Sequence, residues 1–287
     1  MKRKIGLFLS LFLLLALALP FTVFADMGPK PRVVVRMENL PEGNCYVDLL
    51  IEKSGDYENI TEQNRSALNP DMLAVLENYS GEYGYPALTC GTNIPLFGSL
   101  PGEADGNDRL YTFSYFGVPD EFRLIAVTED LQLKVSEPIR KDVLQIHVTW
   151  DFQSNKVTQP STFPAYLIQL LGTLLPTLLI EGVILLLFRF SLKQNWLPFL
   201  ITNLVTQLGL FLIIGIPTVR SGYLAYYFTF FPAELVILVV ECLVYVYFLK
   251  GRGKGWRIAY AITANAASCA AGFFLAQPLF QLITRIL

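Results

Sequence analysis

Four long apolar runs in the second half of the chain constrain its fold more than any other feature. They cover residues 165–188, 196–217, 223–249 and 257–280, and each is long enough to cross a hydrocarbon layer about 30 Å thick as a helix. The chain is 53% hydrophobic and only 16% charged, whereas soluble domains carry about 25% charged residues. The pattern therefore predicts four transmembrane helices.

Basic residues in the loops predict the direction of these helices. The loops at 189–195 and 250–257 together contain six Lys or Arg residues, whereas the loop between the second and third helices contains only Arg220. Lys and Arg accumulate in short cytoplasmic loops. We therefore expect loops 189–195 and 250–257 to face the cytoplasm and residues 26–164 to be extracytoplasmic.

The first 25 residues have the pattern of a secretory signal peptide. Lys2, Arg3 and Lys4 precede a long apolar stretch, and Val23-Phe24-Ala25 offers a cleavage site. We expect cleavage after Ala25, which leaves Asp26 as the new N-terminus. The alternative is an uncleaved anchor helix.

Residues 26–157 predict an exported domain of short strands. Of the 24 acidic residues, 21 lie between residues 26 and 160, an acidity that disfavours nucleic acid as a partner. Apolar and β-branched runs between turn residues predict strands at 32–40, 45–53, 110–117, 122–128, 131–136 and 143–152. A short helix is expected from Pro70 to about Tyr79, capped by Asn69.

Six or more short strands with close turns are typical of an all-β sandwich. Residues 158–164 then form a linker to a transmembrane domain of residues 165–287. The predicted fold is an α+β membrane protein, with an extracytoplasmic all-β sandwich followed by a four-helix bundle made of two tandem helical hairpins.

The exported region offers few residues for catalysis. The sequence contains neither zinc-ligand spacing, nor a Gly-x-Ser-x-Gly motif, nor a phosphate-binding glycine loop, so we expect no enzyme activity, no cofactor and no metal. Asp105-Gly106-Asn107-Asp108 lacks the distant Glu of a calcium loop, which favours a solvated turn. Export permits a disulfide between Cys45 and Cys90, although the sequence leaves open whether the two meet.

A short motif directly after the predicted cleavage site carries a resemblance. Asp26-Met27-Gly28-Pro29-Lys30-Pro31 precedes the strands and the four apolar runs, and Val118-Pro119-Asp120-Glu121-Phe122 and Val135-Ser136-Glu137-Pro138-Ile139 fit the same pattern. The chain in this respect resembles a group of uncharacterised exported membrane proteins of Gram-positive bacteria. The resemblance implies a location in the cell envelope and brings no known activity.

Three acidic residues, Glu181, Glu234 and Glu241, lie within the apolar runs. A charged group at mid-bilayer costs about 2.5 to 3.5 kcal/mol on insertion scales. We therefore expect all three to face the interior of the bundle rather than lipid.

The two predicted hairpins share a spacing that indicates a diverged repeat. The interval from Glu181 to Trp196 is equal to the interval from Glu241 to Trp256. An Asn follows each Trp, so two Glu and two Asn are expected in one layer near the middle of the bilayer. The expected intramembrane polar cluster is Glu181, Glu234, Glu241, Asn203, Asn265, Gln207 and Thr177.

Three interpretations of this cluster stay open. It can hold helices together, because a protonated Glu donates to an Asn carbonyl; it can bind an ion, a proton or a small solute; or it can serve signalling or partner binding.

Two hypotheses for the function of the protein follow. One is an envelope protein whose β domain binds a wall component or another envelope protein. The other is a transporter-like unit, oligomeric in this case, that handles a proton or cation through Glu181, Glu234 and Glu241.

Overall fold

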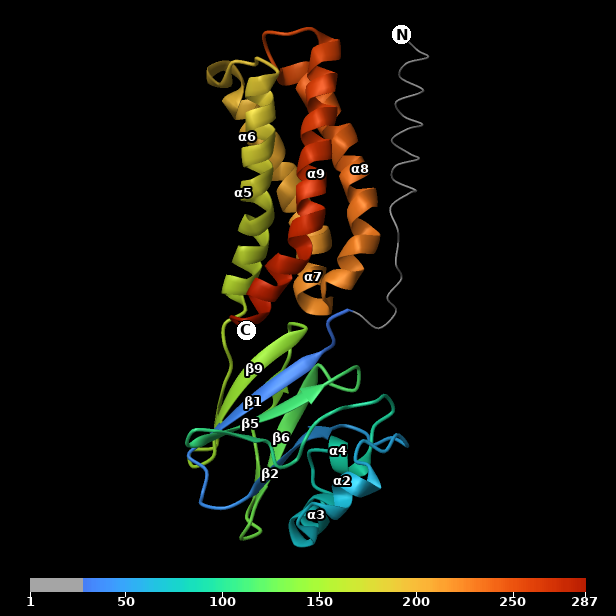
Figure 1. Cartoon of the computed structure of the whole chain (residues 1–287), viewed down its shortest axis with the longest axis vertical. Coiled ribbons are helices and arrows are strands. Elements are labelled where there is room, and N and C mark those ends of the chain that lie inside the picture. The colour runs from blue at the N-terminus through green and yellow to red at the C-terminus, as the bar shows by residue number, and fades with distance from the viewer. Residues whose placement is uncertain (1–27) are drawn as a thin grey trace.

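The computed structural model describes residues 28–287. The chain forms a β-rich domain and a bundle of long helices, stacked end to end (Figure 1). The predicted signal peptide, its cleavage site, and Asp26 and Met27 of the motif lie outside the described residues.

Two sheets make up the β-rich domain. The first has the strand order β10-β9-β1-β5-β4, and the second has the order β3-β2-β6-β7 with β8 paired to β6. β1 is antiparallel to β5 and parallel to β9. The strands are β1 (Arg32–Glu38), β2 (Cys45–Ile51), β3 (Tyr85–Pro86), β4 (Glu103–Asp105), β5 (Asp108–Ser114), β6 (Glu121–Thr128), β7 (Leu133–Val135), β8 (Ile139–Arg140), β9 (Gln145–Asp151) and β10 (Lys156–Thr158). The six predicted strands are confirmed, and β3, β4, β8 and β10 are short additions to them.

The two sheets share one hydrophobic core. Along β1, Val33, Val35 and Met37 are buried and the residues between them are half-exposed, which is the alternation expected of a strand with one face inside. All residues of β2 from Cys45 to Leu50 are buried. Both faces of β2 are therefore covered, one by the opposite sheet and the other by helices.

Three short helices lie beside the second sheet (Figure 1), so the β-rich domain is not all-β as the sequence predicted. They are α2 (Glu62–Ser66), α3 (Pro70–Glu77) and α4 (Ala87–Cys90). α3 confirms the predicted helix, and the side chain of Asn69 caps it by accepting from the backbone N–H groups of Asp71 and Met72. α2 and α4 were not predicted, because segments of five and four residues are too short to show helical periodicity.

The buried side chain of Asp48 attaches α4 to β2. Its Oδ1 accepts from the backbone N–H groups of Leu49 (2.7 Å) and Leu88 (2.9 Å). Its Oδ2 accepts from the backbone N–H of Thr89 (3.0 Å) and from the Thr89 hydroxyl (2.8 Å). Burial raises the pKa of Asp48 to about 6, and the four donors act against that rise. Both oxygens of this carboxylate have partners, as a structural role requires.

The Cys45–Cys90 disulfide that export would permit is not formed, and both thiols are free. Cys45 begins β2, three residues before Asp48, whereas Cys90 ends the helix that Asp48 binds. A strand rises about 3.3 Å per residue, so Cys45 lies roughly 10 Å along β2 from Asp48, the residue that holds the helix of Cys90. A disulfide needs Cα atoms within about 7 Å.

Within residues 28–287, four helical spans are long and apolar enough to cross a membrane. They cover Phe163–Leu187, Leu192–Ser221, Tyr226–Phe248 and Lys254–Thr284. The helices are α5 (Phe163–Leu187), α6 (Leu192–Leu210), α7 (Ile216–Ser221), α8 (Tyr223–Phe248) and α9 (Lys254–Thr284), with a π-helical turn at Phe211–Gly215 joining α6 to α7. The chain is therefore built as a multi-pass membrane protein, as predicted.

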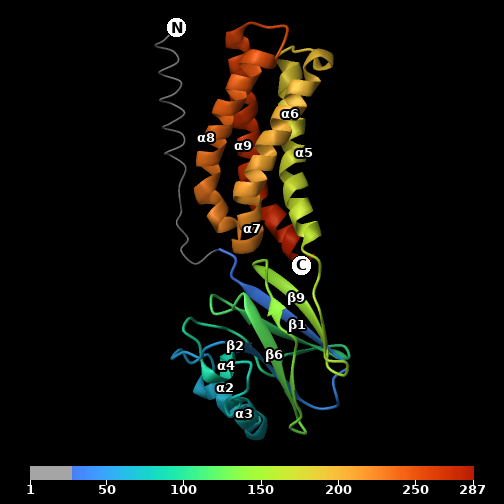
Figure 2. The same ribbon diagram turned by 180° about the vertical axis from the view of Figure 1, so that it is seen from behind.

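The β-rich domain sits directly on one end of the bundle, and the two basic loops lie at the opposite end (Figures 1 and 2). The backbone N–H of Leu144 donates to the carbonyl of Val219 (3.0 Å), and that of His147 donates to the carbonyl of Leu287 (2.7 Å). Val219 and Leu287 also join the core of the β-rich domain. Main-chain bonds and apolar packing thus join the two units.

Candidate functional site

Each of the four long helices contributes one polar residue to a buried layer inside the bundle. Glu181 lies on α5, Asn203 on α6, Glu241 on α8 and Asn265 on α9, and none is more than 4% exposed. The layer thus contains the two Glu and two Asn residues that the sequence places at similar depth. Their hydrogen bonds, however, divide the two acids into different kinds of site.

Both carboxylate oxygens of Glu241 have donors. The Thr206 hydroxyl on α6 donates to Oε1 at 2.9 Å, and the Asn265 amide on α9 donates to Oε2 at 2.6 Å. Glu241 therefore links α8 to two neighbouring helices. Such an arrangement is the polar glue expected between helices in lipid.

Glu181 has a hydrogen-bond donor for only one of its oxygens. The Ser268 hydroxyl on α9 donates to Oε1 at 2.9 Å. Oε2 is buried, and no group in the described part of the chain makes a hydrogen bond to it. A buried acceptor without a donor is rare in native proteins and calls for an explanation.

Tyr245 explains why the two acids differ. In the second hairpin the Asn265 amide donates to Glu241, but in the first the Asn203 amide donates to the Tyr245 hydroxyl (3.0 Å) and to the Phe199 carbonyl (3.1 Å). Tyr245 lies one turn after Glu241. The corresponding residue after Glu181 is Leu185, which has no oxygen to accept a hydrogen bond.

Two hydroxyl residues that the sequence reasoning missed join the hairpins to each other. Thr206 of the first hairpin donates to Glu241 of the second, and Ser268 of the second donates to Glu181 of the first. Each hydroxyl lies three residues after the Asn of its own hairpin. This shared spacing is the sequence signal that could have identified Thr206 and Ser268.

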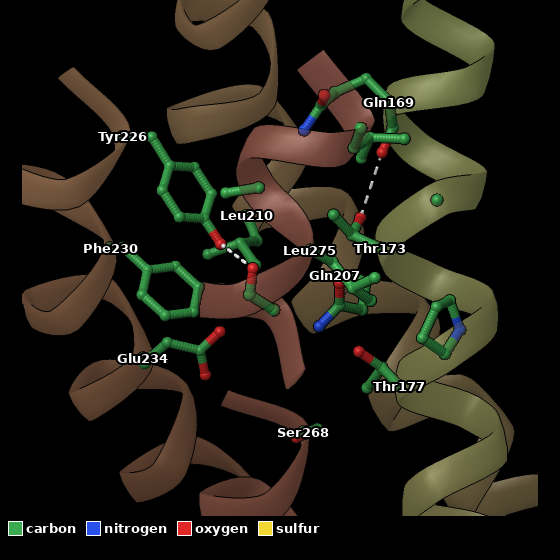
Figure 3. Close-up of a pocket in the computed structure, with 15 residues that line it drawn as sticks. Gln169, Thr173, Thr177, Gln207, Leu210, Tyr226, Phe230, Glu234, Ser268 and Leu275 are labelled. Atoms are coloured by element: carbon green, nitrogen blue, oxygen red, sulfur yellow. Dashed lines mark hydrogen bonds between the residues drawn. The ribbon is translucent and has the colours of Figure 1, made fainter. Parts of the chain in front are cut away.

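A small cavity lies beside this layer, on the side of the β-rich domain. Its volume is about 20 Å³, which is room for roughly one water molecule and excludes a larger solute. Figure 3 shows the polar side chains that surround it between the helices. The polar lining residues are Gln169, Thr173, Thr177, Gln207, Glu234 and Ser268.

Two of these lining residues carry unpaired oxygens. Gln207 is 5% exposed and its Oε1 has no donor among the described residues. Glu234 is half-buried, and no described residue forms a hydrogen bond or ion pair with it. Figure 3 shows its carboxylate turned toward the space between the helices. Ser268 connects the cavity to Glu181, because it both lines the cavity and donates to that carboxylate.

An apolar and aromatic cluster fills the bundle between the acid layer and the basic loops. The rings of Tyr245 and Tyr260 lie 5.2 Å apart, and those of Phe190 and Tyr260 lie 5.6 Å apart. The buried members of this aromatic plug are Leu185, Phe190, Phe199, Tyr245, Leu249, Tyr260, Ala261 and Ala264. Toward the loops the polar layer is thus packed by apolar and aromatic side chains, and toward the β-rich domain it adjoins the cavity.

The groups around Glu181 suit a proton or a hard monovalent cation. All available ligand atoms are carboxylate, amide or hydroxyl oxygens, which hard cations prefer. Among residues 28–287, no group of three or more His, Cys, Asp or Glu side chains could hold a metal ion. No basic side chain of the described residues pairs with Glu181, Glu234 or Glu241.

The β-rich domain carries a separate groove on its surface, with a volume of about 290 Å³. Ile94 and Phe116 line it, and they are 51% and 53% exposed.

Comparison with known proteins found no matching family model, no matching curated protein and no matching solved structure.

Proposed function

We propose that this chain is a multi-pass protein of the cell envelope in which the bundle binds a proton or small cation at Glu181 and an exported β-rich domain binds a ligand or partner. The observation that carries this proposal is the unpaired Oε2 of Glu181, in a buried layer that adjoins a polar cavity through Ser268. A purely structural layer would have a donor for each buried oxygen, as Glu241 has.

Energetics favour binding of a positive charge at this layer. An isolated carboxylate inside a membrane is costly, and no described Lys or Arg offsets the charges of the three acids. A proton or a monovalent cation at Glu181 supplies one positive charge and neutralises that carboxylate. Because Ser268 connects the cavity to Glu181, the exchange is expected from the side of the β-rich domain.

Carbodiimide labelling tests whether Glu181 is an exchangeable acid. Dicyclohexylcarbodiimide partitions into membranes and modifies protonated carboxyls there, and peptide mass spectrometry identifies the modified residue. We expect modification at Glu181, faster at lower pH, and little at Glu241. Glu181→Gln removes the reactive carboxyl and serves as the control. A folded protein in which Glu181 resists the reagent at every pH contradicts the proposal.

The sidedness is tested with cysteines placed on the two ends. Asp142→Cys in the β-rich domain and Lys193→Cys in a basic loop are both exposed positions, introduced into a chain without its four native cysteines. In intact cells an impermeant maleimide should label the first and not the second. The reverse pattern contradicts an extracytoplasmic β-rich domain.

Transport across the membrane is the second candidate function, favoured by the position of the cavity on one side of the acid layer. The aromatic plug closes the other side, so transport would require it to open. Purified protein in vesicles would be tested for proton or sodium flux. Flux that disappears in Glu181→Gln supports transport, and its absence in the folded wild type leaves binding alone.

The groove of the β-rich domain is the candidate site for a ligand or partner. A photo-crosslinking amino acid at Phe116, in the groove, should capture a wall component or envelope protein in native membranes. The same amino acid at Glu121, which is exposed and does not line the groove, is the matched control. Equal capture at both positions contradicts a specific role for the groove.

A further inference from the structure

We infer that a monovalent cation of about the size of sodium binds between the oxygens of Glu181, Asn203 and Gln207. The inference rests on the proposed function, because it names the ion and its ligands at that same site. Three buried oxygens carry it, namely Glu181 Oε2, Asn203 Oδ1 and Gln207 Oε1, none of which has a hydrogen-bond donor among the described residues.

The orientation of the Asn203 amide is set by its two acceptors. Its Nδ2 donates to the Tyr245 hydroxyl and to the Phe199 carbonyl. A carbonyl can only accept, so an amide turned end for end would place oxygen against oxygen. Asn203 is fully buried and its side chain interacts with that of Glu181. Its Oδ1 is consequently held in the interior as a buried, unpaired acceptor, with no freedom to exchange places with the nitrogen.

Gln207 brings the second amide oxygen to the cavity. It lies one turn after Asn203 on α6, so the two side chains share a helix face. On α5, Thr177 lies one turn before Glu181, and both Thr177 and Gln207 line the cavity. Figure 3 shows the side chains of Gln207 and Thr177 close together between the helices. Gln207 and Thr177 therefore face a common space, and Asn203 and Glu181 lie one helical turn beyond it on the same two helices.

The count of acceptors favours a cation over a proton. One proton on Glu181 can donate to a single neighbouring oxygen, so at least one amide oxygen would stay unpaired. A cation interacts with all three oxygens at once, and a charge of +1 balances the one carboxylate. A divalent ion would need further carboxylates. The adjoining cavity, which Gln207 lines and Glu181 and Asn203 do not, has a volume of about 20 Å³ and offers room for roughly one water molecule beside the ion.

Tyr245 is the positioning residue of this site. Without its hydroxyl, one hydrogen of the Asn203 amide loses its acceptor, and the amide becomes free to turn toward Glu181. Glu181 would then acquire a donor, as Glu241 has in Asn265. The single difference between Tyr245 and Leu185 thus creates a binding site in one half of the repeat and a structural bond in the other.

Protection of Glu181 against dicyclohexylcarbodiimide measures the binding of the cation. The reagent modifies only a protonated carboxyl, so a cation bound to Glu181 slows the modification. Protein in vesicles would be treated at fixed pH with increasing sodium chloride, and with potassium or choline chloride at equal ionic strength. We expect protection by sodium, weaker protection by potassium and none by choline.

Two variants test the ligands. Gln207→Leu and Tyr245→Phe should each raise the sodium concentration for half-protection by about tenfold or more, while Glu181 is still modified when sodium is absent. Gln194→Leu is the matched control, because Gln194 is exposed at the far end of the bundle, and it should leave the sodium dependence unchanged. Tyr245→Phe should also reduce the preference for sodium over potassium, which a merely structural role would not change.

The outcomes separate the inference from the proposed function. Modification of Glu181 that depends on pH but on none of the three salts shows a proton site, which overturns the cation and keeps the proposed function. Absence of modification at any pH overturns both. Sodium protection that Gln207→Leu and Tyr245→Phe leave unchanged contradicts the ligand set.

Discussion

The β-rich domain and the helical bundle each bury carboxylates, and the two regions supply very different numbers of donors. Asp48 accepts four hydrogen bonds, whereas Glu241 accepts two and Glu181 accepts one. In the β-rich domain, backbone N–H groups at the start of α4 are available as donors. Inside a helical bundle these groups are used within the helices, so side chains must supply every donor.

This difference teaches how to separate structural acids from functional ones. Burial alone does not do so, because Asp48, Glu181 and Glu241 are all at most 1% exposed. The number of unpaired carboxylate oxygens separates them, because it is zero for Asp48 and Glu241 and one for Glu181. Four predictions test this ranking, from the largest expected effect to the smallest.

Removal of the most fully bonded acid should have the largest effect. Asp48→Ala should lower the free energy of unfolding of the β-rich domain by about 4 kcal/mol, because four donors lose their acceptor in the core. Denaturant unfolding of the full chain, followed through Trp150 with Trp196 and Trp256 replaced by Phe, measures it. Glu52→Ala, at an exposed position just after β2, is the control and should change stability by less than about 0.5 kcal/mol.

The pH dependence of the same acid gives the second prediction. The folded pKa of Asp48, about 6, exceeds its ordinary value of 3.8, so the folded state binds the proton more tightly. The contribution of this group to stability is therefore full below about pH 4 and is lost as pH rises to about 6. The loss is about 3 kcal/mol.

Unfolding experiments at several pH values, on the wild type and on Asp48→Asn, isolate this contribution. The difference between the two proteins should change between pH 4 and pH 6 and be constant above pH 7. A difference that is the same at every pH contradicts the raised pKa.

Neutral replacements of the two intramembrane acids should differ from each other. Glu241→Gln leaves one acceptor oxygen for the two donors Asn265 and Thr206, and should destabilise the bundle by about 2 kcal/mol. Glu181→Gln keeps the bond from Ser268 and offers new hydrogens to the unpaired oxygens, so its effect should be below about 0.5 kcal/mol. Thermal unfolding in one detergent compares them, and equal losses would remove the distinction between the acids.

The hydroxyl donors should contribute small and similar amounts. Thr206→Val and Ser268→Ala each remove one hydrogen bond between helices, worth about 0.6 kcal/mol on average inside membranes. The same thermal unfolding experiment measures both variants. A loss for Ser268→Ala several times larger than that for Thr206→Val would indicate that Glu181 depends structurally on this single bond.

Much of the architecture was readable from local patterns. Long apolar runs without loops inside them can satisfy their backbone groups only as helices in a membrane, so the four spans follow directly from the sequence. The alternation of buried and half-exposed residues along β1 predicted that strand for a similar reason. The helices α2 and α4 were missed because each is held by contacts outside its own segment, such as the bonds from Asp48 to α4.

The candidate site was predicted only in outline. Three acids in apolar runs and a repeated spacing placed Glu181 and Glu241 at one depth, because the constant rise of a helix converts residue number into height. The sequence presented them as equivalent. Thr206 and Ser268 were overlooked because single hydroxyl residues in an apolar helix are common and carry no pattern of their own.

The sequence alone thus determined which acidic residues have to be buried inside the bundle and at what depth. The hydrocarbon core disfavours every charged side chain, and each residue of a helix adds the same rise. Only the tertiary structure decided which buried oxygens find donors. That outcome depends on side chains from different helices meeting within about 3 Å, as the Asn203 amide meets the Tyr245 hydroxyl. One hydroxyl, present at Tyr245 and missing at Leu185, therefore divides two similar acids into a structural bond and a candidate binding site.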